Sequence, residues 1–345
     1  MVGVRKRGEE IRQFILDNIE KHPLDLAKFV GEAFGISRQA VNRHIHNLVD
    51  QNLIEVDGSS RYPHYRLKPL MSWEQIYPLD GNLEENRVWR TDIAPQLGEL
   101  PKNIIDILHY GFTEILNNAI DHSGGTMALI ALDRMATSFE IGITDNGEGI
   151  FKKIKNALNL VDERESALEL VKGKLTTDLS RHTGEGIFFT SRVFDSFRIL
   201  SGSAAFYHDF GENEDWIFEQ AENSTGTSVF MSLKNHATQT LKSIFNQFTS
   251  GEEDDFTFSK TVVPVALAQY GTEALISRSQ AKRVLNRIEK FKTVMFDFAR
   301  VETIGQAFAD EIFRVFANSH PEIELHPINA NPDVQAMISR ALAVR

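Results

Sequence analysis

Polar side chains able to carry out chemistry gather on the segment 111–123. On a helix that advances 100° per residue, one face of this segment is apolar, and the opposite face carries Glu114, Asn117, Asn118 and Asp121. A carboxylate and a carboxamide four residues apart are helix neighbours, so Glu114 and Asn118 can converge on one site. Such a pair can orient a water or hydroxyl beside an oxygen ligand for Mg²⁺. A solvated helix face has the same pattern.

Glycine-rich motifs follow this segment at three places. The first, Asp145-Asn-Gly-Glu-Gly149, ends a stretch of alternating apolar residues that is typical of a strand. The second, His182-Thr-Gly-Glu-Gly186, opens a predicted helix, and a glycine loop at a helix N-terminus offers backbone N–H groups to phosphate. The third, Thr225-Gly-Thr227, enters another strand. The order and spacing of these motifs make the helix 111–123 a candidate site.

The set resembles the ATP-binding domain that gyrase B subunits, MutL mismatch-repair proteins, heat-shock chaperones and histidine kinases share, the GHKL superfamily. Its N box matches Glu114-x-x-x-Asn118-Ala-Ile-Asp121, its first glycine box Asp145-x-Gly147-x-Gly149, its second Gly184-x-Gly186, and its late threonine Thr227. The resemblance implies an α/β sandwich of the Bergerat type, with ATP and Mg²⁺ as cofactors.

The resemblance also assigns roles to individual residues. Glu114 would be the general base for hydrolysis or for activating a substrate hydroxyl. Asn118 would bind Mg²⁺, and Asp121 would order waters around it. Asp145 would accept a hydrogen bond from the adenine amino group, with support from Thr227. Further nucleotide contacts are expected at Gly147, Gly149, Thr183, Gly184 and Gly186, below a helical lid over residues 150–181.

Two features of that superfamily are missing from the sequence. No helix with a phosphoacceptor histidine precedes the ATP-binding segment, and no large transducer domain follows it. The resemblance therefore does not extend to autophosphorylation or to efficient hydrolysis by the chain alone.

The first seventy residues read as three helices and a hairpin. Ser37 is a predicted N-cap for a helix over 38–52, and Asp57-Gly58 is a predicted turn between two strands. This arrangement resembles the winged helix-turn-helix of bacterial transcription regulators. The residues implied to contact DNA are Ser37, Arg38, Gln39, Asn42 and Arg43 in the major groove, with Arg61 and Arg66 in the wing. A winged helix that binds protein is the alternative.

The end of the chain alternates strands and helices and resembles small STAS-like domains. In related anti-anti-sigma factors a phosphorylated serine follows the central strand, but here that place is Gly305-Gln306-Ala307, which has no hydroxyl. We therefore expect a docking or regulatory role. The expected fold is multidomain α/β: a helix-rich winged helix at 1–70, a connector at 71–100, an ATP-binding domain at 101–235, a linker at 236–255 and a STAS-like domain at 256–345.

Composition is that of an ordinary globular protein without cysteine, which excludes disulfides and thiolate chemistry. The net charge of −11 opposes nucleic-acid binding, but residues 1–70 carry 11 Lys and Arg against 9 Asp and Glu, and the remainder 26 against 39. DNA binding is therefore expected at the N-terminal segment alone. No signal peptide or membrane span is predicted, so we expect a cytoplasmic protein.

Three functions fit these observations. The first is a transcription regulator in which Mg-ATP binding, with slow hydrolysis or without it, controls DNA binding. The second is a serine/threonine protein kinase like the anti-sigma kinases, in which Glu114 activates a hydroxyl of a partner protein. The third is an interaction module with ATP as a ligand. A homodimer is also open, because winged helices often bind symmetric sites as dimers.

Overall fold

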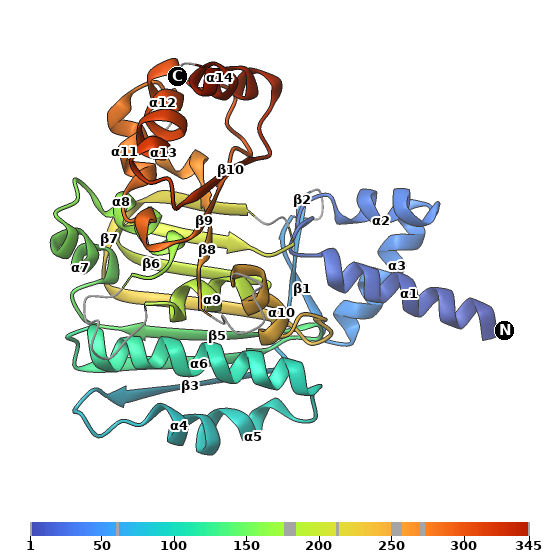
Figure 1. Ribbon diagram of the computed structural model, residues 1–345. Helices are drawn as coiled ribbons and strands as arrows, with labels where there is room; N and C mark the ends of the chain where they lie inside the picture. The colour runs from blue at the N-terminus through green and yellow to red at the C-terminus, as the bar shows by residue number, and fades with distance from the viewer. Residues whose placement is uncertain are drawn as a thin grey trace.

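The computed structural model describes residues 2–59, 62–175, 184–211, 214–249, 257–269 and 273–343. In Figure 1 the N-terminal helices lie at one end of a central sheet, and the C-terminal helices lie along the side of the same sheet. Among these residues, no helix has both the length and the apolar character that crossing a bilayer requires.

The N-terminal unit consists of three helices and a hairpin: α1 (Val2–Asn18), α2 (Leu26–Phe34), α3 (Arg38–Asp50), β1 (Ile54–Ser59) and β2 (Tyr62–Leu67). Gly35 ends α2 with a φ of 62°, a left-handed conformation that glycine adopts without strain. The Ser37 hydroxyl then accepts a hydrogen bond from the Ala40 N–H and caps α3. Ile15, Val30 and Ile45 bring the three helices together in one buried cluster.

The predicted turn of the wing at Asp57-Gly58 was wrong. Both residues lie inside β1, where they pair with His64 and Pro63 of β2, and the ladder continues one pair further. An Asp-Gly pair favours a turn only where the chain finds no cross-strand partner, and here the partner strand extends past it.

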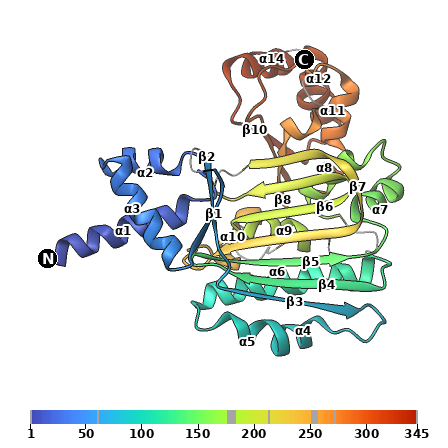
Figure 2. The same ribbon diagram turned by 180° about the vertical axis from the view of Figure 1, so that it is seen from behind.

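The central unit is an antiparallel sheet in the order β3-β4-β5-β7-β6. Its strands are β3 (Met71–Pro78), β4 (Met127–Arg134), β5 (Ser138–Asp145), β6 (Ser196–Asp209) and β7 (Glu214–Lys234). Helices α6 (Lys102–His122) and α9 (Gly186–Val193) lie against one face, and the opposite face is turned to the viewer in Figure 2.

Strand β3 lies in the segment that we predicted to be a connector without clear periodicity. It pairs with β4 along its whole length and forms one edge of the sheet. Its pattern was obscured because Tyr77 is buried while the neighbouring Ile76 is 61% exposed. The rest of that segment forms α4 (Glu85–Val88), a π-helical turn η1 (Trp89–Ile93) and α5 (Ala94–Leu97), with Trp89 stacked on His109 of α6.

Apolar side chains on alternate positions of β5 hold α6 on the sheet. Phe139, Ile141 and Ile143 are buried, each stabilising the fold by about 1.5–3 kcal/mol relative to exposure. A Cβ added at Gly111 of α6 would lie 2.2 Å from a ring carbon of Phe194. A glycine is therefore needed where α6 meets the chain that follows α9.

The C-terminal unit has a parallel sheet in the order β10-β9-β8, built from β8 (Lys260–Pro264), β9 (Thr293–Asp297) and β10 (Glu324–Ile328). Its helices are α11 (Arg278–Leu285), α12 (Gln306–Asp310), a π-helical turn η5 (Glu311–Phe316), α13 (Ala317–Ser319) and α14 (Pro332–Ala343). Ser277 forms a capping box with Gln280 at the start of α11, and the Asn331 side chain accepts from the Val334 N–H at the start of α14.

The central and C-terminal units share one continuous hydrophobic core, whereas the N-terminal unit has its own. Phe258, just before β8, packs against Phe188 and Phe189 of α9. Phe248 joins the same aromatic cluster from a short 3-10 turn, Asn246–Phe248, which follows α10 (Leu241–Phe245). The predicted linker at 236–255 therefore contains ordered, packed structure over the part that is described.

Candidate functional site

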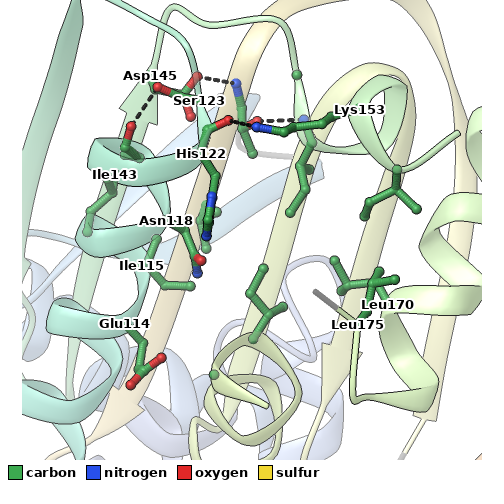
Figure 3. A pocket seen from close by; sticks show the side chains of 18 of the residues that line it. Glu114, Ile115, Asn118, His122, Ser123, Ile143, Asp145, Lys153, Leu170 and Leu175 are labelled. Atoms are coloured by element: carbon green, nitrogen blue, oxygen red, sulfur yellow. Dashed lines mark hydrogen bonds between the residues drawn. The ribbon is translucent and has the colours of Figure 1, made fainter. Parts of the chain in front are cut away.

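A pocket of about 160 Å³ opens between α6, the end of β5 and two helices that follow it, α7 (Ile150–Leu158) and α8 (Glu163–Lys172). Glu114, Asn118 and His122 line it from one side of α6, as Figure 3 shows. Residues four apart lie on the same face of a helix, so the three side chains form a polar row along the pocket.

Asp145 lies at one end of this row, where β5 ends, and is 7% exposed. Its carboxylate accepts hydrogen bonds from the Gly147 N–H at 2.8 Å and the Thr227 N–H at 3.3 Å. Burial raises the pKa of Asp145 above its ordinary value, and these two backbone hydrogen bonds act in the opposite direction. The Thr227 hydroxyl accepts from the Ile150 N–H, so it also fixes the start of α7.

Close backbone packing around Asp145 explains the glycines of the first and third motifs. Gly226 has a φ of 73°, and a Cβ there would lie 1.9 Å from the Asp145 carbonyl oxygen. Gly149 has a φ of 90°, and its Cβ would lie 2.7 Å from the Ser201 hydroxyl oxygen. Side chains at either position would displace the strand end that carries Asp145.

The second glycine motif forms the other end of the pocket. Gly184 has a φ of 72°, and its carbonyl accepts from the Leu175 N–H at 3.1 Å. A Cβ at Gly186 would lie 2.0 Å from Oε2 of Glu114, so the start of α9 is in direct contact with that carboxylate. Burial raises the pKa of Tyr110, and the nearby carboxylates of Glu114 and Glu185 raise it further.

Seven of the residues predicted from the sequence line this one pocket: Glu114, Asn118, Asp145, Gly149, Gly184, Gly186 and Thr227. Asp121 and Gly147 do not. Asp121 is exposed, because one residue before His122 its side chain points about 100° away around the helix. Gly147 packs instead against the end of α6, where a Cβ would lie 2.1 Å from the Ser123 carbonyl oxygen. Thr183 lies outside the described residues.

Sequence reasoning missed two ionisable side chains of the pocket, His122 and Lys153. His122 continues the spacing of four from Glu114 and Asn118, so the helical pattern could have revealed it. Lys153 lies on α7, and its Nζ donates to the His122 carbonyl oxygen at 2.6 Å. No local signal marks Lys153, because its approach to α6 depends on the tertiary fold.

The part of the chain that the structure describes holds no group of three or more His, Asp or Glu side chains arranged to bind a metal ion. The Asn118 carboxamide is one oxygen ligand of the kind that Mg²⁺ accepts beside phosphate oxygens and waters.

The residues predicted to contact DNA lie at the start of α3. Arg38, Gln39 and Arg43 are exposed, and Asn42 is half-buried. The Ser37 hydroxyl caps the helix, as described above. Arg61 lies outside the described residues, and Arg66 of the wing forms ion pairs with Glu55 and Asp57.

Two protein-family models match parts of the chain. Residues 14–61 match the MarR family. Residues 280–335 match a STAS-like domain of unknown function, DUF4325. The chain joins a MarR-family winged helix to a STAS-like domain. No curated protein matches it. The predictions of a winged helix and of a STAS-like domain are thus confirmed, whereas the GHKL resemblance of the central unit stays a prediction.

Proposed function

We propose that the chain is a DNA-binding transcription regulator whose central unit binds Mg-ATP, and that nucleotide occupancy controls how the winged helix binds DNA. The observation that carries the nucleotide half is the convergence of Glu114, Asn118, Asp145 and the two glycine motifs on one pocket. The match of residues 14–61 to the MarR family supports the DNA half.

In this proposal the adenine lies at the Asp145 end of the pocket. A buried carboxylate that is still able to accept would take a hydrogen bond from the exocyclic amino group of adenine, which guanine lacks at that position. Ile143, Ile150 and Val229 supply apolar surface for a planar base.

The triphosphate would extend along α6 toward Gly184 and Gly186. Backbone N–H groups at the start of α9 can donate to phosphate oxygens, and the helix dipole favours negative charge there. This end already holds Glu114 and Glu185, so a divalent cation is needed to offset the like charge. When bound, Mg²⁺ would neutralise phosphate charge, with Asn118 as its protein ligand.

Glu114 is placed to act on a group beside the terminal phosphate. Its carboxylate contacts the start of α9 and lines the pocket, so it can orient a water or a hydroxyl. Water as the nucleophile gives an ATPase; a hydroxyl of a partner protein gives a kinase.

The decisive experiment incubates the full chain with Mg²⁺ and γ-labelled ATP, with and without cell extract, beside Glu114→Ala. Label released as phosphate by the wild type and lost in the variant supports a nucleotide-driven switch. Label transferred to a protein would establish the kinase instead. ATP binding without turnover leaves the nucleotide as a regulatory ligand, and absence of ATP binding would refute the proposal for the central unit.

The DNA half is tested by replacing Arg38 and Arg43 together with Ala. We expect DNA affinity to fall by about tenfold or more and its dependence on salt to become less steep, because two cations leave the interface. The matched control replaces Lys282 and Arg340, both exposed in the C-terminal unit, with Ala and removes the same charge. Equal losses in both double variants, measured by fluorescence anisotropy, would contradict DNA binding through α3.

A further inference from the structure

The side chain of Lys153 extends from α7 to the end of α6. Its Nζ donates to the His122 carbonyl oxygen at 2.6 Å, in the last turn of α6, where the helix dipole favours a positive charge. Figure 3 shows the two residues meeting on the same side of the pocket as Asp145. The side chain is half-buried, and among the described residues no carboxylate forms an ion pair with it.

The charges of the pocket require such a cation. Two carboxylates line it, Asp145 at one end and Glu114 at the other. Lys153 is the one Lys or Arg among the lining residues that the structure describes. A nucleotide adds further negative charge, which the two carboxylates repel. An ammonium group that exchanges a neutral carbonyl for a phosphate oxygen offsets part of this repulsion.

Its position along α6 selects which phosphate it can reach. His122 lies eight residues beyond Glu114, which is about 12 Å along the helix axis. The base is proposed to lie beside Asp145, and the terminal phosphates beside Glu114 and Gly186. A lysine anchored at His122 is therefore within reach of the phosphate attached to the ribose, and remote from the terminal one.

We propose that Lys153 leaves the His122 carbonyl when a nucleotide binds and donates to the phosphate next to the ribose, so that the pocket distinguishes nucleotides from nucleosides. This inference rests on the proposed nucleotide function. Lys153 is a ligand-binding residue for every adenine nucleotide, whatever its number of phosphates.

The test is calorimetric titration of the full chain and of Lys153→Ala with adenosine, AMP, ADP and ATP, the last two with Mg²⁺. We expect the variant to bind AMP, ADP and ATP more weakly by a similar factor of about tenfold, since one charge-assisted hydrogen bond is lost in each. Adenosine affinity should be unchanged. Lys153→Arg should retain most of the nucleotide affinity.

The control is Lys152→Ala, which removes the same charge from the exposed neighbour on α7 and should bind all four ligands like the wild type. The proposal is overturned if Lys153→Ala keeps wild-type nucleotide affinity, if the loss is confined to ATP, or if adenosine loses as much as AMP. Failure of the wild type to bind any of the four ligands refutes the nucleotide function itself, which separates the two results.

Discussion

At the scale of single residues, Asp145 carries a cost in stability, which the proposed hydrogen bond to adenine would account for. It is buried, and its two hydrogen-bond donors are backbone N–H groups rather than a positively charged side chain. Burial disfavours its charged form, so its pKa is raised. The stability that such a group contributes is present below about pH 4, the ordinary range of Asp, and is lost as the pH rises through the raised pKa.

Asp145→Asn should therefore separate stability from binding. At pH 7 the variant carries no buried charge, so its thermal midpoint should equal or exceed that of the wild type. Its affinity for ATP should fall by about tenfold or more, because the amide is a weaker and differently oriented partner for the adenine amino group. Differential scanning fluorimetry and calorimetric titration measure the two effects. Wild-type affinity for ATP in this variant would argue against adenine at this end.

At the scale of elements, a glycine packs closely against a neighbouring residue at each end of the pocket, and the two contacts have different consequences. A Cβ at Gly226 would meet the backbone of Asp145, which cannot rotate aside as a side chain can. Gly226 is also in a left-handed conformation, which strains any other residue. Gly186 meets the tip of the Glu114 side chain, which can rotate away.

Gly226→Ala and Gly186→Ala should accordingly differ. The first should destabilise the chain by about 2 kcal/mol or more through strain and backbone displacement. The second should leave the free energy of unfolding nearly unchanged, yet displace Glu114 and reduce any Glu114-dependent turnover. Urea unfolding and the labelled-ATP assay give the two readouts. Equal destabilisation by both substitutions would show that the start of α9 is as rigid as the strand end.

Elements with a local signal were predicted best. The capping residue Ser37 marked the start of a helix correctly, because a cap depends on the next few residues alone. The row of side chains on α6 could likewise be read from its spacing, since the helix period is fixed.

What the sequence did not reveal depends on distant partners. Strand β3 is paired on one side only, and its exposed Ile76 hides the alternation. Lys153 reaches the pocket because α7 packs beside the end of α6, a contact between residues 31 positions apart. The shared core of the central and C-terminal units was missed for the same reason, as Phe258 finds its partners on α9.

At the scale of the whole molecule, the helix α8 joins the pocket to the C-terminal unit. Leu170 lines the pocket, and two residues later Lys172, 1% exposed, donates to the carbonyls of Arg283 and Asn286 at 2.8 and 2.9 Å. The same ammonium pairs with Glu169 at 2.7 Å. A change in the position of α8 would therefore alter both the pocket and the contacts with the C-terminal unit.

Lys172→Met should destabilise the chain by about 3 kcal/mol or more, because it removes one member of a buried ion pair and leaves two carbonyls without this donor. If α8 couples the units, ATP affinity should fall as well. Lys282→Met, on the exposed side of α11, is the control and should change neither quantity. Urea unfolding and ATP titration check both; a variant with wild-type values would exclude α8 as the link.

The two hydrophobic cores set where the chain can be divided. Residues 1–70 bury their apolar side chains largely among themselves, so this segment can be detached as a module and exchanged for another without opening the rest. A chain truncated before residue 257 would instead leave Phe188, Phe189 and Phe248 facing water, and such a fragment is expected to aggregate. In architecture the molecule is thus bipartite, although its sequence reads as three parts.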